Sequence, residues 1–320
     1  MQNNAEPLVQ IIIPTYKRPA LFKEALLSAL AQTYKNIRIF ITDNSDDDET
    51  ELLMRPFLEL DPRITYEHHP EYNEQDNWNR GMEMTDPEAV YVNWLMDDDL
   101  FFPTKIAEMV AAFQSHKNLS LVTSSRLHID LNGQPIPDLG TPNLPVSGDT
   151  LIPGSGAALS ILTEQCNYIG EPTTPLIRRD CLLNGHDLGW TGKEGRYFLS
   201  DIPTWLHVLE HGDLYFIKKP LSAFRLHGTQ VGKKMHFIIS VQGTWAYLIH
   251  HAVTAGIYLT AEDDIRRTLE EWLKGTAAAL AHADNNGYTG EDVDTMRSVY
   301  ENMKAALDDS SQMHSFSVPC

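Results

Sequence analysis

The chain has 320 residues, 42% of them hydrophobic and 22% charged, which describes an ordinary globular protein with one large or two modest domains. With 25 basic and 44 acidic residues its formal net charge is −19, and this argues against nucleic acid as a partner. A nucleotide is still allowed, because carboxylates can hold a divalent cation that in turn binds phosphate.

The first expected element is a buried strand at 9–13, where β-branched residues run up to Pro14. Apolar residues then recur at helical spacing between Leu21 and Leu30, and Pro19 is suitably placed near a helix start. Three more strands are expected, at 37–42, 64–66 and 90–95.

Strands that alternate with helices over the first ~125 residues indicate an α/β fold with a mostly parallel, doubly wound sheet. In such sheets ligands bind beyond the carboxyl ends of the strands. Three expected strands end in polar loops, at Pro14-Thr15-Tyr16, Asp43-Asn44-Ser45 and Asp97-Asp98-Asp99. A parallel sheet would bring these loops to one edge, and we predict the ligand site there.

The second part of the chain is less regular. A strand pair is expected at 119–124 and 126–130, and 132–156 reads as a long loop or insertion rich in Gly, Pro and Asn. Three helices are expected toward the end, at 237–255, 261–281 and 290–307. We therefore divide the chain into a first domain, residues 1–234, and a C-terminal helical region, residues 235–320.

The triplet Asp97-Asp98-Asp99 is the strongest candidate for chemistry. Three carboxylates directly after an apolar strand repel one another and are costly to hold together unless a cation neutralises them. A solvated turn is the ordinary alternative, but apolar segments on both sides favour the functional interpretation. The equally acidic segment 46–49 leads into a helix-like stretch, where the helix dipole favours carboxylates, so we expect no ligand role there.

Four segments, in their order and spacing, resemble the opening of family 2 glycosyltransferases of the GT-A fold. They are Ile11–Pro19, Ser28–Tyr34, Ile41–Ser45 and the aspartates 97–99, which resemble the DXD motif of that family. Asn73 and Asn77-Trp78-Asn79 resemble an asparagine-bearing segment often found between the last two. The similarity covers about residues 8 to 230. It implies that residues 1–234 form a GT-A, Rossmann-like catalytic domain that uses a nucleotide sugar.

The resemblance also implies roles for single residues. The nucleotide sugar is expected to contact Pro14, Thr15, Tyr16, Arg18, Asp43, Asn73, Asn77, Asp97, Asp98 and Arg225. Among these, Asp43 would meet the base and Arg225 a phosphate. The cofactor would be Mg²⁺ or Mn²⁺ on Asp97 and Asp99, with His227 as a third ligand, although which two of the three aspartates bind it is left open. Lys17 stands where many members of the family carry Asn.

The general base implied by the resemblance is Asp201, which lies beside an expected helix start and has helix capping as its alternative role. Ser200 stands where the family more often has Glu. A single carboxylate base without a partner nucleophile favours transfer with inversion. Gly170-Glu171-Pro172-Thr173 is expected either on the sugar or acceptor side of the site or as a tight turn.

The sequence thus predicts an inverting glycosyltransferase with a UDP-sugar donor and a hydroxyl acceptor on a glycan, a lipid-linked molecule or a protein, acting in bacterial-type surface polysaccharide, glycolipid or glycoprotein glycan synthesis. The alternative is a non-catalytic module that binds nucleotide sugar or glycan for a larger assembly. A sugar-1-phosphate nucleotidyltransferase would open with a Gly-rich phosphate loop instead of Pro14-Thr15-Tyr16. The C-terminal helices are expected to dock on the catalytic domain, to form a homodimer, to present an acceptor surface or to associate with a membrane surface, and the sequence does not choose among these roles.

Three cysteines without CxxC spacing cannot all pair, which favours a reducing compartment. The first residues do not resemble a signal peptide, and no run of about 18 apolar residues occurs. We expect a cytoplasmic chain without transmembrane insertion, either free or peripheral at the inner face of the membrane.

Overall fold

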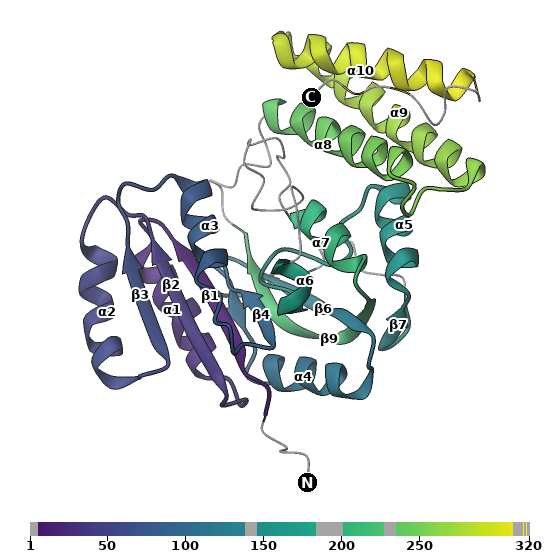
Figure 1. Cartoon of the computed structure of the whole chain (residues 1–320). Coiled ribbons are helices and arrows are strands. Elements are labelled where there is room, and N and C mark those ends of the chain that lie inside the picture. The colour runs from purple at the N-terminus through teal and green to yellow at the C-terminus, as the bar shows by residue number, and fades with distance from the viewer. Residues whose placement is uncertain are drawn as a thin grey trace.

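The computed structural model describes residues 6–137, 146–183, 201–226 and 235–309, together with Phe316 and Val318. A twisted sheet flanked by helices forms the larger part, and three C-terminal helices stack beyond one end of it (Figure 1). The expected α/β class, with a mostly parallel first half and a C-terminal helical extension, is confirmed.

The described residues contribute nine strands to one sheet, in the order β3-β2-β1-β4-β8-β6-β9-β5, with β7 paired to β9. The first four strands are mutually parallel: β1 (Val9–Thr15), β2 (Ile37–Asp43), β3 (Ile64–His68) and β4 (Tyr91–Trp94). The others are β5 (Leu100–Phe101), β6 (Leu119–Ile129), β7 (Thr150–Ile152), β8 (Leu176–Arg178) and β9 (Asp213–Arg225). β8 runs antiparallel to β4 and joins the parallel half of the sheet to the rest.

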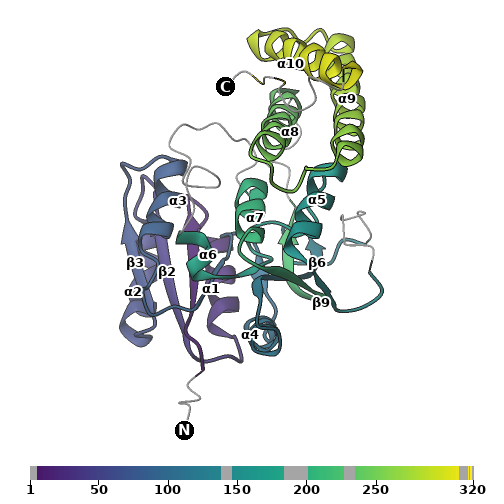
Figure 2. The same cartoon turned by 45° about the vertical axis from the view of Figure 1, so that its right-hand side comes forward.

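Helices cover both faces of this sheet. Those of the first half are α1 (Pro19–Leu30), α2 (Glu49–Leu60), α3 (Glu74–Glu83) and α4 (Lys105–Ser115). The later ones are α5 (Gly154–Glu164), α6 (Arg179–Leu183), α7 (Asp201–Leu209), α8 (Met235–Thr254), α9 (Glu262–Asn285) and α10 (Glu291–Asp308). The three helices expected after residue 235 are therefore present, and α5 and α7 lie beneath them (Figure 2).

Alternation along β1 separates two apolar cores. Ile11 and Ile13 pack on one face against α1 and α4, whereas Ile12 points to the other face and joins Trp94. This second core continues without a break through α5 and α7 into the C-terminal helices, where Trp272 is fully buried. The division at residue 234 stays a prediction, and the shared core shows that the two parts are packed together.

Pro14 lies inside β1, although we expected it to end the strand. The backbone groups of residues two apart in a strand face the same neighbouring strand. Pro14 therefore faces β4, as does Ile12, whose carbonyl accepts from the Leu95 N–H. β4 has already ended at Trp94, so the N–H that proline lacks has no strand to bind there.

The expected strand pair at 119–130 is wrong. A single strand, β6, spans both halves, with register shifts against β9 around Ser124 and Ser125. The expected break between the two strands falls at Ser125, but both serines are buried and form an irregularity within the ladder. The expected loop at 132–156 likewise contains β7 and the start of α5.

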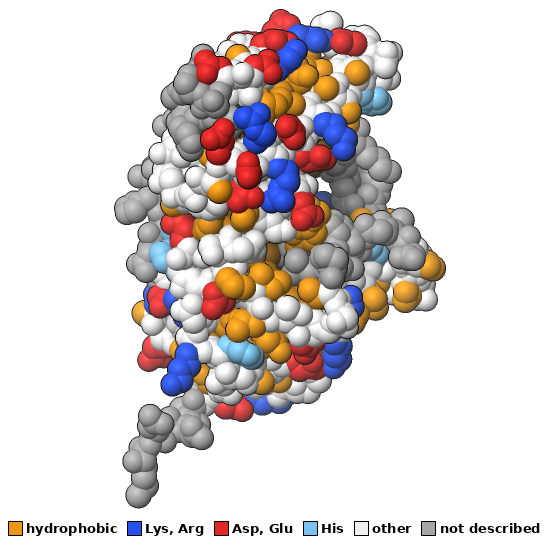
Figure 3. Space-filling view, turned by 90° about the vertical axis from the view of Figure 1, so that its right-hand side faces the viewer, with side chains coloured by type: hydrophobic (Ala, Val, Ile, Leu, Met, Phe, Trp, Pro, Cys, Tyr) orange, Lys and Arg blue, Asp and Glu red, His pale blue; other side chains and the backbone are white. Residues whose placement is uncertain are grey.

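Acidic and basic side chains are interspersed over the C-terminal helices on the face shown in Figure 3. In the part of the chain that the structure describes, no helix is both long and apolar enough to cross a membrane.

Candidate functional site

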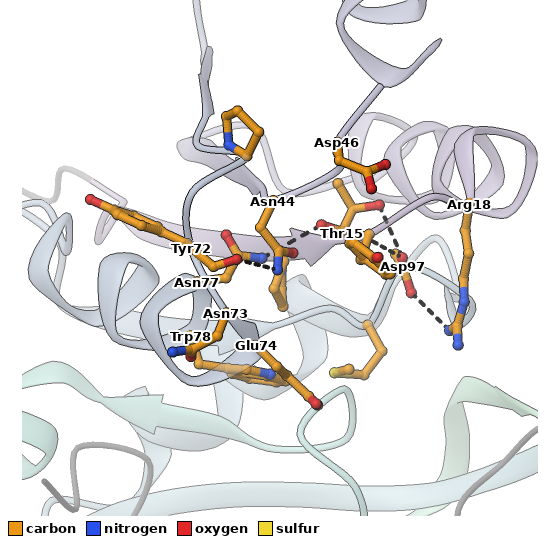
Figure 4. Close-up of a pocket in the computed structure, with 14 residues that line it drawn as sticks. Thr15, Arg18, Asn44, Asp46, Tyr72, Asn73, Glu74, Asn77, Trp78 and Asp97 are labelled. Carbon is orange, nitrogen blue, oxygen red and sulfur yellow. Dashed lines mark hydrogen bonds and ion pairs between the residues drawn. The ribbon is translucent and has the colours of Figure 1, made fainter. Parts of the chain in front are cut away.

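The carboxyl ends of β1, β2 and β4 converge at one edge of the sheet, as expected. The register pairs Thr15 with Asp43, and β4 ends at Trp94 opposite Ile12, so the chain after it runs on toward Thr15. A cavity of about 510 Å³ opens at this edge (Figure 4). Seven residues predicted to contact the nucleotide sugar line it: Pro14, Thr15, Tyr16, Arg18, Asn73, Asn77 and Asp97.

Asp97 is the member of the aspartate triplet that lines this cavity. One carboxylate oxygen accepts from the Thr15 hydroxyl at 2.9 Å and from the Tyr16 N–H at 3.3 Å, and the other lies 3.4 Å from the Arg18 guanidinium. Burial and the neighbouring Asp98 charge raise the pKa of Asp97 to about 6, against the opposing effects of Arg18 and the two hydrogen bonds. The carboxylate is thus held by donors, yet it remains costly to ionise.

Arg18 connects the first two aspartates of the triplet. Its guanidinium nitrogen Nη1 is 3.0 Å from the Asp98 carboxylate as well as 3.4 Å from that of Asp97. The Arg18 side chain is 41% exposed, so it can swing away at little cost. The carboxylates of Asp97 and Asp98 are therefore bridged by the guanidinium of a partly exposed side chain.

Asp99 points into the interior and away from the cavity. Its side chain is fully buried, with one oxygen accepting from the Thr173 hydroxyl at 2.5 Å and the other from the Arg225 N–H at 3.0 Å. Thr173 in turn accepts from the Met96 N–H at 3.1 Å. Burial, with the nearby Asp98 charge, raises the pKa of Asp99 well above its ordinary value. The predicted metal contact of Asp99 stays a prediction that this placement does not favour.

Arg225 is also turned inward, although we expected it at a phosphate. Its side chain is fully buried and donates to the carbonyls of Asp98, Asp130 and Leu131 and to the Glu24 carboxylate. With these contacts Arg225 fastens the aspartate turn to α1 and to the end of β6. It does not line the cavity.

Asp43 lies at the end of β2 but beneath the cavity wall. One oxygen accepts from both the N–H and the hydroxyl of Ser45, at 2.8 and 2.6 Å, and the other from the Tyr66 hydroxyl at 2.7 Å. The Asp43 side chain is fully buried. A direct contact between Asp43 and a nucleobase therefore stays a prediction, and Asn44 lines the cavity in its place.

The two predicted asparagines line the cavity, and their hydrogen bonds also hold its wall in place. Asn73 caps α3 by accepting from the Asp76 N–H at 2.9 Å. Asn77, which is buried, accepts from the Thr42 hydroxyl at 2.6 Å and donates to the carbonyls of Thr42 and Thr15. Asn77 thereby ties α3 to the ends of β1 and β2.

Lys17 has a positive φ of 51° between Tyr16 and Arg18. Its N–H donates to the Ser45 hydroxyl at 2.8 Å, so the turn after β1 is held against the loop after β2. Asn adopts this left-handed conformation more readily than Lys. The departure from the family therefore costs some backbone strain but keeps the turn.

Asp201 is the first residue of α7. One oxygen accepts from its neighbour Ile202 N–H at 2.9 Å, and the other from the Asn167 side-chain amide at 2.7 Å. Burial raises the pKa of Asp201 to about 6, with the Glu171 charge as a smaller contribution in the same direction. A carboxylate with such a pKa is ionised at neutral pH and can accept a proton there.

The segment 167–174 joins the two acidic groups. Its first residue donates to Asp201, and its Thr173 donates to Asp99. Between them Glu171 forms an ion pair with the buried Arg126, at 2.5 Å. Residues 170–173, expected either on the sugar or acceptor side or as a tight turn, therefore link the aspartate triplet to the predicted base, and their contact with a sugar or acceptor stays a prediction.

The described residues contain no cluster of three His, Cys, Asp or Glu side chains that could hold a metal ion. The predicted third ligand, His227, lies outside the described residues. Asp97 and Asp98 fit a divalent ion nevertheless, because Mg²⁺ commonly uses one or two carboxylates and completes its shell with water and substrate phosphates. The guanidinium of Arg18 between them shows that a positive charge is accommodated at this point.

The other half of the cavity lining was not among the contacts predicted from the sequence, although Asn44 belongs to a loop that was expected at the ligand edge. It consists of Asn44, Asp46, Pro70, Tyr72, Glu74, Trp78 and Met96. In Figure 4, Tyr72 and Trp78 lie on the side of the cavity away from Arg18. Their signal in the sequence is proximity to Asn73 and Asn77. The cavity thus has a charged side and a side with two aromatic rings.

Residues 10–148 match the family model described as Glycosyl transferase family 2. An uncharacterized glycosyltransferase of Rickettsia typhi is 35% identical over 121 residues, which cover 38% of this chain and 36% of the relative. One of Rickettsia felis is 26% identical over 295 residues, 88% of this chain and 44% of the relative. The chain therefore spans less than half the length of these relatives.

A third relative is named GalNAc(5)-diNAcBac-PP-undecaprenol beta-1,3-glucosyltransferase, from Campylobacter jejuni. It is 28% identical over 93 residues, covering 29% of this chain and 30% of the relative.

Two solved structures share the fold. Residues 1–349 of S. aureus TarS in complex with UDP-GlcNAc superpose with a TM-score of 0.60 at 12% identity, covering 96% of this chain and 90% of that one. The mannosyltransferase PcManGT of Pyrobaculum calidifontis, in complex with GDP-Man and Mn²⁺, superposes with a TM-score of 0.54 at 14% identity. The match covers 97% of this chain and 86% of that one. At these identities the likeness establishes the fold alone, which is of the GT-A type.

Proposed function

Because residues 10–148 match the family model of glycosyltransferase family 2, we propose that the protein transfers a sugar from a nucleotide-sugar donor to an acceptor hydroxyl. The observation that carries the proposal is the position of Asp97. It lies after a buried parallel strand, in the wall of a cavity of about 510 Å³, and is held there by Thr15, Tyr16 and Arg18.

The donor lies in this cavity, with its nucleoside toward Tyr72 and Trp78 and its diphosphate toward Arg18. The aromatic rings offer a stacking surface, and the exposed guanidinium offers a partner for phosphate. A UDP-sugar is our first choice of donor, supported by the UDP-GlcNAc in the TarS complex. The GDP-Man bound by PcManGT makes a guanosine donor the alternative to test.

The metal ligands in this proposal are Asp97 and Asp98. We prefer them to Asp97 and Asp99, the pair expected from the sequence, because both oxygens of Asp99 already accept hydrogen bonds inside the fold. Bound Mg²⁺ or Mn²⁺ supplies neutralisation of the charge that grows on the leaving nucleoside diphosphate. Arg18 leaves the two carboxylates and binds the diphosphate.

Asp201 serves as the general base. It takes the proton of the acceptor hydroxyl while that oxygen bonds to the anomeric carbon and the bond from this carbon to the diphosphate oxygen breaks. One base and no nucleophile among the described site residues favour inversion of the anomeric configuration. The acceptor is a sugar hydroxyl on a lipid-linked glycan, a class supported by the name of the Campylobacter relative.

The proposal is tested with a panel of UDP-GlcNAc, UDP-glucose and GDP-mannose, each with and without Mn²⁺. We expect one donor to raise the melting temperature only with the metal, and to release nucleoside diphosphate slowly to water. Asp201→Asn keeps the thermal stabilisation but loses the release. Stabilisation without any release by wild-type protein, with glycan acceptors added, would support a non-catalytic binding module instead. Nuclear magnetic resonance of the product's anomeric carbon decides inversion.

A further inference from the structure

Asn167 is the one residue in the described chain for which a side-chain hydrogen bond to the Asp201 carboxylate is seen. Its amide nitrogen lies 2.7 Å from the Asp201 oxygen Oδ2. The other oxygen, Oδ1, accepts from the Ile202 N–H of the same helix. Asn167 therefore contacts the carboxylate oxygen that the helix leaves available.

The orientation of the Asn167 amide is fixed by Gly170. The Gly170 N–H donates to the Asn167 carbonyl oxygen at 2.9 Å, and this donor can only be met by an oxygen. The NH₂ group must then face Asp201, and it also reaches the Gly170 carbonyl at 3.1 Å. The contact to Asp201 is thus a donated hydrogen bond and cannot be reversed by flipping the amide.

Gly170 itself is held firmly. It has a φ of +102°, and a Cβ there would lie 2.7 Å from the Thr174 hydroxyl, so only glycine fits. The Trp205 indole N–H of α7 donates to the Gly170 carbonyl at 3.1 Å. Asn167 is therefore attached to the same helix that carries Asp201, which fixes the geometry of the pair.

Among the described residues, the charged side chains recorded as acting on Asp201 are Glu171 and Arg126, which pair with each other at 2.5 Å. Their opposite effects on the carboxylate partly cancel. A neutral amide that donates to the carboxylate favours its charged form without adding a charge. Asn167 is the neighbour whose side chain donates directly to the carboxylate oxygen Oδ2.

We propose that Asn167 is a positioning residue, whose amide orients the Asp201 carboxylate and favours its ionised form, the form that a base requires. The inference rests on the proposed role of Asp201 in catalysis. The contact itself can be measured independently of that role. Since Thr173 of the same segment donates to Asp99, the segment 167–174 sets the base relative to the aspartate triplet.

The first test measures the titration of Asp201 without any substrate. Protein labelled with ¹³C at aspartate carboxyls is followed by nuclear magnetic resonance from pH 4 to 8, and the Asp201 signal is assigned by its loss in Asp201→Asn. We expect Asn167→Leu to raise the pKa of Asp201 by about one unit. Asn167→Asp, which keeps the shape and the acceptor for Gly170 N–H, raises it further because two carboxylates then share the contact.

Asn118→Leu is the matched control. Asn118 donates to the Asp213 carboxylate at 3.1 Å on an exposed surface, so this variant removes an amide–carboxylate contact elsewhere and should leave the titration of Asp201 unchanged. An unchanged pKa of Asp201 in a folded Asn167→Leu or Asn167→Asp protein would overturn the proposal.

A further arm needs no substitution at Asn167. In ¹⁵N-labelled wild-type protein the chemical shifts of the Asn167 side-chain amide protons should change with pH, with a midpoint at the pKa of Asp201. In Asp201→Asn this change should be absent. Amide shifts that ignore the titration contradict the proposal even where the Asn167 variants fail to fold. The acidic limb of the pH profile of kcat/KM then separates the role of Asn167 as a positioning residue from the role of Asp201 as the general base. If the pKa moves with Asn167→Leu and the limb does not, Asn167 positions Asp201 but Asp201 is not the base.

Discussion

Asp97, Asp98 and Asp99 are adjacent in sequence but differ in their surroundings. Asp97 lines the cavity, Asp98 faces Arg18, and Asp99 is enclosed by Thr173 and the Arg225 backbone. Their order in the chain is enough to predict an acidic site, because an apolar strand precedes them. It does not reveal which carboxylate is enclosed, since Thr173 and Arg225 come from remote parts of the chain.

Removal of the Asp98 charge should damage metal use and leave the fold intact. We expect Asp98→Asn to lose the Mn²⁺-dependent rise in melting temperature and to slow nucleoside diphosphate release by about 10²–10³-fold. Asp48→Asn is the control, because Asp48 is exposed and its side chain makes no cap hydrogen bond at α2. Equal release rates for Asp98→Asn and wild type would remove Asp98 from the metal site.

The raised pKa of Asp201 predicts a stability that depends on pH. The folded value is about 6 and the ordinary value is 3.8, so the folded state binds the proton more tightly. The contribution of this carboxyl group to the stability of the fold is therefore fully present below about pH 4, and it is lost as pH rises through about 6. Asp201→Asn has no such loss, and its melting temperature relative to wild type should be higher at pH 7.5 than at pH 4, measured without metal. A constant difference across this range would contradict the shift.

Sequence reasoning located the parallel half of the sheet well, because long β-branched runs and polar loops mark its strands. It missed β7 and the whole of α5, and it split β6. A strand of three residues carries too little pattern to be recognised, and the break expected within β6 falls at Ser125, which is buried. In the site, the roles of Asn167 and Thr173 depend on contacts across the fold, which no local pattern records.

The start of α5 explains why that helix begins with glycine. A Cβ on Gly154 would lie 2.1 Å from the Gly212 carbonyl oxygen and 2.5 Å from that of Leu209, so the helix approaches the end of α7 closely. Gly156, two residues later in the same helix, has no neighbouring atom within 4 Å of such a Cβ.

The two glycines therefore form a matched pair of substitutions. Gly154→Ala should destabilise the protein by about 1–3 kcal/mol, because backbone atoms must move. Gly156→Ala should stabilise it by about 0.5–1 kcal/mol through helix propensity. Urea unfolding followed by circular dichroism measures both, and a neutral Gly154→Ala would contradict the close approach.

One of the two apolar cores extends from the sheet into the C-terminal helices and joins the two parts of the molecule. Trp272 of α9 is fully buried in it and donates its indole N–H to the Gln242 carbonyl of α8 at 3.0 Å. The Thr163 and Thr268 hydroxyls lie 3.1 Å apart and link α5 to α9. We expect the two parts to unfold together.

Trp272→Ala tests this expectation. It should cost about 3–5 kcal/mol and still unfold in a single transition in urea. Leu60→Ala is the control, since Leu60 is 83% exposed and its loss should be close to neutral. Two transitions, with donor-induced stabilisation confined to the second, would instead show that residues 1–234 fold as an independent domain.

The place of β8 in the sheet has a consequence for synthesis of the chain. β4 hydrogen-bonds to β1 on one edge and to β8 on the other, and β8 begins 82 residues after β4 ends (176 − 94). While a ribosome makes those residues, the nascent sheet carries an open apolar edge at Tyr91 and Val92, the two residues that later pair with β8. Such an edge pairs readily with other chains. A polypeptide released before Leu176 should therefore precipitate or be captured by chaperones, even though every strand of the parallel half is complete.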